Sequence, residues 1–534
     1  MRNLLPPLAA YLAAALVTGA LASLIQTQLV LAVLLAYDAP VTGTIRAWTT
    51  LADLARFGPV MMGIAAVALL PAFWLASRLT RARGATARCI LAIVAGASAL
   101  AVAFWLMREV IPMPAIPGTR TAAGHAWMSL AGAFGGWVFA RLRVPAAPAA
   151  AAWTATVLVA APIGLFFAMA PRANDPPPTL AQEHYRVQTV SAGLNRPWSI
   201  AFLPDGRALV TEMGGGLRAI ALDGTRTDIA TDALPARFEH AGVAGMMDVA
   251  LDPRFEQTGW LYLSMSYGTA AANGTRLVRA RLNATGAQPR LEDVRILFDG
   301  TLKPRPGNNG GRIAFLPDDT LVLSIGDGLA QREAAQRLDD HLGTVIRLDR
   351  DGRAPDDNPF ARQSGAAAQI YSLGHRNMQG LTIDPFTGDL LASEHGARGG
   401  DEINRVLRGR NYGWPVVANG IDYPFASVTP FTRLAGYEDA LLQWTPAIAP
   451  AGLAVYDGAL FADWRGDLLV PALKTRDLRR VKRDGRQIVG EQRLLVERDE
   501  RVRDVAVGPD GAIYVLTDGP DGALLRLTPS SPTP

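Results

Sequence analysis

Long apolar runs without acidic or basic residues fill most of the first third of the chain. Each run reaches about the 17–25 residues that a helix needs to cross a bilayer. The runs lie at 8–36, 59–77, 89–107, 123–140 and 150–170. A cleaved signal peptide does not explain the first run, because that run is long and further runs follow it. The pattern predicts an α-helical transmembrane bundle of about five helices within residues 1–172.

The arginines beside these runs predict an orientation across the membrane. One side would hold Arg2, Arg78, Arg81, Arg83, Arg88, Arg141 and Arg143, and the opposite side would hold Arg46, Arg56, Arg108 and Arg120. Cytoplasmic loops carry the excess of basic residues, so the first set is expected in the cytoplasm. An odd number of crossings then places the chain after Arg172 outside the cytoplasm. The expected location is the inner (plasma) membrane, with the second half of the chain periplasmic.

A different pattern begins after residues 173–180, whose consecutive prolines predict a short, stiff linker. Apolar residues now alternate in short runs separated by Asp-Gly, Asn-Gly and Gly-Gly turns. One unit recurs, in which an apolar strand leads through a tight turn, often Pro-Asp-Gly-like, into a second apolar strand. Its copies begin at Ser199, Asp248, Arg312, Gly380, Gly452 and Asp504. A period of roughly 50–70 residues indicates four strands per blade, so residues 181–534 are expected to form an all-β six-bladed β-propeller.

Composition and charge narrow the class of protein. Of the 534 residues, 49% are hydrophobic and 19% are charged, whereas globular proteins average about 25% charged residues. A disordered chain is excluded, because disorder needs low hydrophobicity and high net charge. The net charge of +4 without a clustered basic stripe predicts no nucleic-acid partner. Cys89 is the single cysteine, and it is expected to be a buried small hydrophobic residue.

Several motifs of the second half follow one another in a specific order and spacing. They are Gly374-His375-Arg376-Asn377, Ser393-Glu394-His395-Gly396-Ala397, Gly400-Asp401-Glu402-Ile403-Asn404, Gly409-Arg410-Asn411-Tyr412-Gly413-Trp414-Pro415 and Arg501-Val502-Arg503-Asp504. From Val190 to Leu527 the chain resembles the soluble quinoprotein sugar dehydrogenases, namely the glucose/sorbosone and aldose sugar dehydrogenases. The resemblance implies a six-bladed propeller that uses pyrroloquinoline quinone (PQQ) and calcium to oxidise aldose sugars. It does not extend to the apolar first half.

The resemblance also implies a set of residues that bind the cofactor. PQQ carries three carboxylates and an ortho-quinone, so its site needs fixed cations and a hard metal ion. The matching positions are Arg376, Asn377, Lys474, Arg501 and Arg503. A structural alternative is that Arg376 and Arg501 pin turns at the edges of blades.

Two calcium sites follow from the same resemblance. The cofactor calcium would be held by the main-chain carbonyls of Gly396 and Ala397, where the second position is usually proline. A second, structural calcium would be held by Glu402, the Tyr412 carbonyl, Asp422 and, as a fourth ligand, Glu438. These carboxylates could instead form salt bridges with nearby arginines. The segment Asp349-Arg350-Asp351-Gly352 lacks the further ligands of a calcium loop and is expected to be a hairpin turn.

Two departures from the family pattern concern the reaction itself. In the family a histidine base takes the proton of the sugar's anomeric hydroxyl, and this position is Asn308 here. General-base catalysis typically contributes about 10²–10⁴-fold to a rate, and a neutral amide cannot supply it. A glutamine that contacts the cofactor is replaced by Val243. His240, three residues upstream of Val243, is a speculative substitute base.

Three functional hypotheses remain open at this stage. The leading one is a membrane-anchored, PQQ- and calcium-dependent aldose dehydrogenase that contacts membrane lipid through its helices. The second is a non-catalytic propeller that binds a glycan, calcium or a protein partner, and the third is a calcium-dependent hydrolase or lactonase. A bis-histidine haem is excluded in the helices, because His125 is the single histidine there. A membrane quinone is left open as the electron acceptor.

Overall fold

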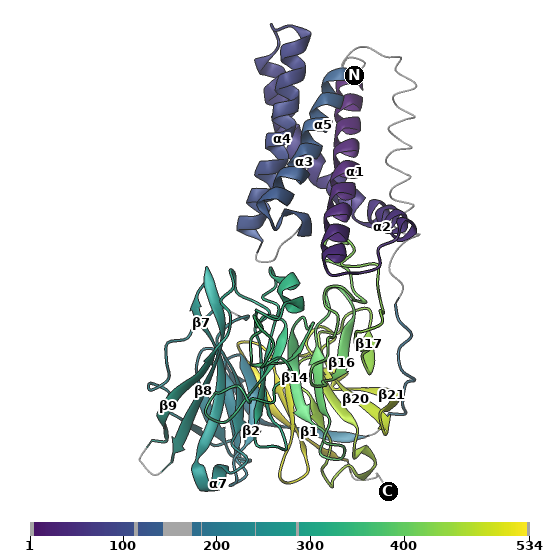
Figure 1. Cartoon of the computed structure of the whole chain (residues 1–534). Helices are drawn as coiled ribbons and strands as arrows, with labels where there is room; N and C mark the ends of the chain where they lie inside the picture. The colour runs from purple at the N-terminus through teal and green to yellow at the C-terminus, as the bar shows by residue number, and fades with distance from the viewer. Residues whose placement is uncertain are drawn as a thin grey trace. The chain divides into compact units, whose positions relative to one another are not determined.

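The computed structural model describes residues 5–111, 116–142, 173–182, 184–240, 242–284 and 288–530. The chain forms two compact units, Met1–Arg172 with Gly420–Thr432, and Ala173–Asn419 with Arg433–Pro534. Each unit is described by itself below, and the labels of helices and strands are those of Figure 1.

The second unit consists of six four-stranded antiparallel sheets. The first three are β2 (Pro197–Phe202), β3 (Ala208–Glu212), β4 (Leu217–Ile220) and β5 (Arg226–Asp228); β6 (Met246–Leu251), β7 (Trp260–Thr269), β8 (Ala272–Asn283) and β9 (Arg290–Asp299); and β10 (Gly310–Phe315), β11 (Leu321–Ile325), β12 (Thr344–Leu348) and β13 (Ile370–Leu373). The other three are β14 (Met378–Ile383), β15 (Leu390–Glu394), β16 (Asp401–Arg405) and β17 (Leu442–Trp444); β18 (Ala454–Val455), β19 (Leu468–Ala472), β20 (Asp477–Asp484) and β21 (Gln487–Leu494); and β22 (Val502–Val507), β23 (Ile513–Thr517), β24 (Gly522–Pro529) and β1 (Tyr185–Leu194).

These sheets close into a six-bladed β-propeller. The first strand of each sheet contacts the first strands of its two neighbours, from β2 through β6, β10, β14, β18 and β22 back to β2. The last blade takes its outer strand, β1, from the beginning of the unit, so the two ends of the propeller chain pair with each other. The second strands, such as β11 and β23, are buried along their whole length, which explains their continuous apolar sequences. The predicted sixfold repeat is confirmed, because each copy forms the first two strands of one blade.

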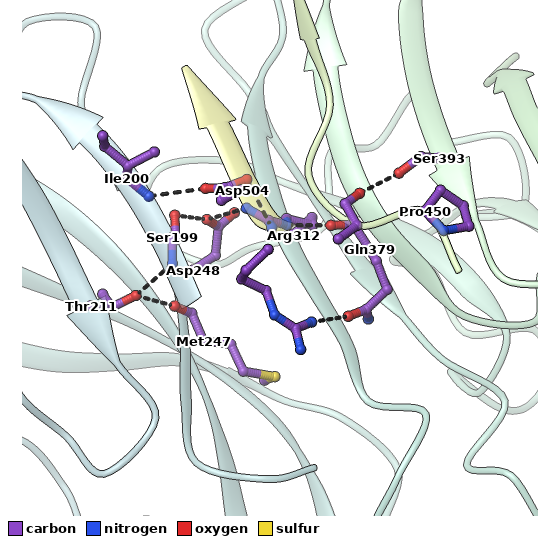
Figure 2. A network of polar contacts seen from close by, with 12 residues as sticks. Ser199, Ile200, Thr211, Met247, Asp248, Arg312, Gln379, Ser393, Pro450 and Asp504 are labelled. Carbon is purple, nitrogen blue, oxygen red and sulfur yellow. Dashed lines mark hydrogen bonds and ion pairs between the residues drawn. The ribbon is translucent and has the colours of Figure 1, made fainter. Parts of the chain in front are cut away.

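A network of buried polar side chains occupies the centre of the propeller (Figure 2). The guanidinium of Arg312 lies 3.3 Å from the Asp248 carboxylate and 3.0 Å from that of Asp504. Its Nε also donates to the main-chain carbonyl of Gln379 at 2.5 Å, and its Cζ lies 4.1 Å from the centroid of the Trp198 ring. These residues come from the first strands of five different blades, so one arginine joins most of the ring.

A β-bulge brings these side chains to the centre. The pairing register shifts at the start of five first strands, at the positions of Trp198, Asp248, Arg312, Gln379 and Arg503. A bulge bends its strand and re-aims a side chain. The same local irregularity in five blades therefore supplies the polar residues of the centre.

We predict that Arg312→Met destabilises the propeller strongly. The substitution leaves two buried carboxylates without their counter-charge, and breaking a buried ion pair in this way costs about 3–5 kcal/mol. The measurement is denaturant unfolding of the full chain in detergent, followed by tryptophan fluorescence. Arg433→Met is the control, because the Arg433–Asp439 pair is exposed and such a pair contributes at most about 1 kcal/mol. Equal losses in the two variants would contradict the prediction.

The first unit is helical and contains α1 (Leu5–Ala36), α2 (Gly43–Arg56), α3 (Gly58–Leu79), α4 (Ala85–Val110), the short η1 (Pro117–Thr119) and α5 (Ala122–Leu142). Among the described residues, three segments are long and apolar enough to cross a membrane: Pro7–Ala36, Gly58–Leu79 and Ala85–Val110. The predicted run 123–140 forms α5, which is not among these three, and the run 150–170 lies outside the described residues. The amphipathic helix α2 was not expected, because it contains no long apolar run.

The glycines of helix α5 allow it to pack closely on α4. A Cβ atom placed on Gly132 would lie 2.2 Å from the main-chain oxygen of Gly96, and one on Gly136 would lie 2.0 Å from that of Ala92. Only glycine permits this approach of two helix backbones, which is the small-xxx-small arrangement of membrane helices. The glycines that make α5 a weak membrane span by hydropathy are therefore its contact with α4.

The substitution Gly132→Ala tests this packing. The added methyl group must push α5 from α4, at a cost of about 1–3 kcal/mol, and the full chain should unfold at a lower temperature in detergent. Gly63→Ala is the matched control, because a Cβ atom on Gly63 meets nothing within 4 Å and alanine favours a helix over glycine by about 1 kcal/mol. The packing account fails if both variants unfold at the same temperature.

The segment Gly420–Thr432 lies between β16 and β17 in sequence but belongs to the helical unit. The buried carboxylate of Asp53 in α2 accepts hydrogen bonds from the Ser427 main-chain nitrogen and the Thr27 hydroxyl, each at 2.8 Å. Ala426 is part of the apolar core of the same unit. Asp422 therefore belongs to the helical unit, whereas the other predicted ligands of the structural calcium, Glu402, Tyr412 and Glu438, belong to the propeller unit.

Candidate functional site

Asn308 is held in a fixed orientation at the entrance to β10. Its φ of 44° is left-handed, a region that asparagine tolerates better than most residues. Its Nδ2 donates to Oδ1 of the buried Asp327 at 2.8 Å. Asp327 also accepts from the Leu329 nitrogen at 2.7 Å and from the Trp414 indole at 2.8 Å. The amide oxygen of Asn308 is thus turned from Asp327, where it can accept a hydrogen bond but cannot take up a proton usefully.

The predicted base position lies against a predicted cofactor residue. A Cβ atom on Gly326 would lie 2.1 Å from the main-chain oxygen of Asn308 and 3.0 Å from Oδ1 of Asn377. The same Oδ1 accepts from the Gly310 nitrogen at 3.2 Å. Glycine at position 326 lets the two asparagines approach each other.

Three of the predicted arginines surround one histidine. Burial, together with the charges of Arg376, Arg503 and Arg501, lowers the pKa of His395 to about 3. The neutral ring lies with Nε2 2.8 Å from the Pro450 carbonyl, to which it donates. Arg376 donates to the main-chain oxygen of His395 at 3.2 Å. The structure therefore brings together arginines that are more than 120 residues apart in the sequence.

Two of these arginines share a single carboxylate. The carboxylate of Asp518 is shared by Arg501 at 2.8 Å and Arg503 at 3.2 Å, and burial lowers the pKa of Arg503. Arg376 lies with its Cζ 5.4 Å from the centroid of the Trp414 ring. A cluster of this kind fits a ligand that carries several carboxylates, because guanidinium groups bind carboxylates strongly. The predicted PQQ-binding cations thus fit the group that the resemblance implies.

Gln379 connects this cluster to the centre of the propeller (Figure 2). Its Oε1 accepts from Arg503 at 3.3 Å, and its Nε2 lies 3.4 Å from Oδ1 of Asn377. Its main-chain carbonyl accepts from Arg312. The cofactor-binding candidates and the central ion pairs therefore form one continuous network.

Three further candidates lie in loops and turns of the propeller. The exposed Lys474 follows Leu473, whose carbonyl accepts from Arg501 at 3.3 Å. Val243 is 44% exposed, and its carbonyl accepts from Asn309 at 2.7 Å. His240 lies on the same turn as Val243, and its ring stacks on that of Phe238 with 6.4 Å between centroids.

A buried Ser–His–Glu arrangement lies behind Arg376. Nε2 of His375 is 2.9 Å from the Ser372 hydroxyl, and Nδ1 is 3.1 Å from the Glu394 carboxylate. The other oxygen of Glu394 accepts from the main-chain nitrogen of Arg376. The three side chains resemble a hydrolase triad, but each is at most 5% exposed, so a substrate cannot reach the serine. Through Glu394 the arrangement contacts the main chain of Arg376, a contact that the sequence motif did not indicate.

The turn predicted to bind the cofactor calcium is tightly fixed. The Gly396 nitrogen donates to Asp401 at 2.8 Å, and Asp401 also accepts from the nitrogens of Ile448 and Ala449 at 2.7 Å. Main-chain carbonyl oxygens such as those of Gly396 and Ala397 are suitable calcium ligands, so the turn fits the predicted ion.

The second predicted calcium has less support. Burial raises the pKa of Glu402 to about 8, and the nearby Glu394 adds to the shift. Oδ1 of the neighbouring Asn404 is buried without a hydrogen-bond partner, whereas Glu438 pairs with Arg410 at 3.3 Å. The Tyr412 ring stacks on His375, 4.5 Å between centroids. Within the described part of the chain, no three His, Cys, Asp or Glu side chains are grouped for a metal.

Comparison with known proteins identifies the family. The sequence profile for Glucose / Sorbosone dehydrogenase matches residues 194–526. The chain belongs to the glucose/sorbosone dehydrogenase family. The predicted family and six-bladed fold are therefore confirmed, and the roles of individual site residues stay predictions.

Members of the glucose/sorbosone dehydrogenase family align with the propeller. Aldose sugar dehydrogenase YliI of Escherichia coli is 36% identical over 347 residues, which are 64% of this chain and 92% of that protein. The apo structure of the soluble aldose sugar dehydrogenase of Escherichia coli has a TM-score of 0.62 at 36% identity and covers 65% of this chain and 100% of its own. The PQQ-bound aldose sugar dehydrogenase of Streptomyces coelicolor has a TM-score of 0.53 at 26% identity and covers 65% and 99%.

Lys303 is a buried lysine near Asp327. It was not identified in the sequence analysis. It is 2% exposed, and its Nζ donates to Oδ1 of Asn273 at 2.6 Å and to the Arg305 carbonyl at 3.1 Å. Burial lowers its pKa to about 8, and the charge of Asp327 opposes this shift. No signal in the sequence marked this lysine, because its surroundings arise only when β8 and the loop before β10 come together.

The depressed pKa of Lys303 predicts a pH dependence of stability. Between pH 8 and 10.5 the unfolded chain binds a proton on this lysine that the folded chain does not, so the unfolding free energy rises with pH. From pH 7.5 to 9.5 the advantage of the wild type over Lys303→Met should grow by about 2 kcal/mol, because one pKa unit corresponds to about 1.4 kcal/mol. Denaturant unfolding at several pH values measures this. The exposed Lys482→Met is the control, and a pH-independent difference for Lys303→Met would contradict the assignment.

Proposed function

We propose that this protein is a membrane-anchored, PQQ- and calcium-dependent dehydrogenase that oxidises aldose sugars to lactones on the periplasmic side. The observation that carries the proposal is the convergence of Arg376, Arg501 and Arg503 around the neutral His395, beside Asn377. The names of the relatives, aldose sugar dehydrogenases of Escherichia coli and Streptomyces coelicolor, support the substrate class.

Each predicted residue of the site has a proposed role in this reaction. Arg376, Arg501, Arg503 and Lys474 would bind the carboxylates of the cofactor, and Asn377 would donate a hydrogen bond to it. The carbonyls of Gly396 and Ala397 would hold the calcium. When bound, PQQ supplies the two-electron acceptor for the anomeric carbon of the sugar. Asn308 would accept a hydrogen bond from the anomeric hydroxyl and so orient it.

Proton removal needs a group other than Asn308. Its amide is bonded to Asp327 through Nδ2, and neither end of an amide is a useful base near neutral pH. His240 is the proposed substitute, because its turn also carries Val243, whose carbonyl bonds to Asn309.

The proposed location follows from the helices and their arginines. Three apolar helices among the described residues are long enough to anchor the chain in a membrane, and the arginine distribution supports a propeller outside the cytoplasm. Sugar oxidation there requires no sugar import, and a membrane quinone is the proposed acceptor of the electrons.

A non-catalytic propeller that binds a glycan, calcium or a protein partner is the second candidate. Asn308 and the half-exposed Val243 favour it, because both replace groups that the family uses near the reacting centre. The retained arginine cluster favours the dehydrogenase.

The substitution Asn308→His separates the two functions. The full chain in detergent is loaded with PQQ and Ca²⁺, and quinone binding and aldose-dependent dye reduction are measured separately. Restoring the base should raise turnover by about 10²–10⁴-fold if the wild type lacks one, while quinone affinity stays constant.

The neighbouring substitution Asn309→His is the control, because it adds an imidazole without the contact to Asp327. If the wild type already turns over and Asn308→His adds little, another base such as His240 is in use. If neither protein binds the quinone, the dehydrogenase proposal is wrong and a binding role replaces it.

A further inference from the structure

A long apolar groove runs between α3 and α4. It encloses about 980 Å³, and its lining is apolar except for Ser98; Val60, Ile64 and Val67 of α3 face Leu91, Val94 and Val102 of α4. Val67 is 77% exposed and Val94 is 52% exposed. The volume lies at the upper end of the range of ligand pockets, which is about 300–1,000 Å³.

A polar and basic pocket lies at the end of this groove where α3 passes into α4. It encloses about 380 Å³ and is lined by Ser77, Thr80, Arg81 and Arg88, with Phe139 of α5 on one side. Ala76 lines both the pocket and the groove. The two hollows are therefore neighbours, one suited to a polar group and the other to a hydrocarbon chain.

The hairpin formed by α3 and α4 carries positive charge at its turn without acidic residues there, so it is suited to bind an anion. The sequence from residue 54 to residue 108 contains no aspartate or glutamate. The Arg78 guanidinium forms a cation–π contact with the Trp74 ring, with its Cζ 4.3 Å from the ring centroid. Arg81 and Arg88 line the pocket without an acidic neighbour from this segment. The first turn of α4 likewise has no acidic residue, and its N-cap residue Gly84 provides no side-chain hydrogen bond.

We propose that the α3–α4 hairpin binds one phospholipid with an anionic head group. The phosphate lies between Arg81 and Arg88, because guanidinium groups bind phosphate oxygens in a bidentate manner. An acyl chain follows Ala76 into the groove. Basic pockets between membrane helices recognise anionic head groups in this way. This site is independent of the propeller and of the proposed oxidation reaction.

The test uses the full-length protein purified in mild detergent. Native mass spectrometry measures the bound fraction of added phosphatidylglycerol and of phosphatidylcholine with the same acyl chains. Arg81→Gln and Arg88→Gln should each weaken phosphatidylglycerol binding about fivefold, because one basic residue near an anionic head group has about that effect. Arg83→Gln is the matched control: it removes the same charge from the same turn, but Arg83 does not line the pocket.

Each outcome decides for or against the site. Selective loss in Arg81→Gln and Arg88→Gln, with Arg83→Gln within twofold of the wild type, supports it. A second variant, Ala95→Phe, fills the groove and should reduce binding of both lipids while leaving dye reduction by the propeller unchanged. Equal binding of the two lipids, or an equal loss in Arg83→Gln, overturns the proposal. A neutral isoprenoid or a second copy of the chain bound in place of the phospholipid would overturn it as well.

Discussion

The buried guanidinium of Arg312 is the constraint on which the propeller and its candidate site depend. Asp248 and Asp504 are buried, which raises the pKa of each carboxyl, and Arg312 lies within about 3 Å of both. The strands that supply this network also supply the site. Asn308 lies two residues before β10, which carries Arg312. Asn377 directly precedes β14, which carries Gln379, and Arg503 directly precedes Asp504 on β22. A bulge at the start of each strand orients the central residues, so the centre and the site cannot shift independently.

Most of the propeller could be predicted because its signal is local and repeated. Strand, turn and strand recur within a few residues of each other, and the copies at Ser199, Asp248, Arg312, Gly380, Gly452 and Asp504 each form the first two strands of a blade. The helices that are long enough to cross a bilayer could likewise be predicted, because each is an apolar run in the sequence. The amphipathic α2 was missed because half of its surface is polar. The glycines of α5 reduce its hydropathy, although their function is contact with α4.

The contacts that could not be predicted join residues that are distant in sequence. Ser427 bonds to Asp53 across more than 370 residues, and no local pattern carries that information. Lys303 depends on Asn273 of β8. The contacts of Glu394 at the end of β15 depend on His375 and Arg376, which lie between β13 and β14. The resemblance to a family supplied the identity of Arg376, Arg501 and Arg503, but only the structure places them around one histidine. Physical reasoning from sequence is strongest where pairing is local and weakest where a polar network is assembled from several blades.

The arginine cluster around Asp518 helps to explain what the replacement of the family's histidine by Asn308 changes. Two arginines share the single carboxylate of Asp518, and burial of Arg503 makes this excess of positive charge costly. A ligand with several carboxylates would stabilise such a cluster. A ligand that binds only the folded state increases the stability of the folded protein. The replacement of the family's histidine by Asn308 leaves this cluster untouched, because Asn308 bonds to Asp327 and not to the arginines. The residues proposed for cofactor binding are thus separate from the position of the family's base. Under the proposed function, loss of the usual base would slow the reaction without removing the physical reason to bind an anionic cofactor, so cofactor affinity and turnover can be measured as two distinct properties.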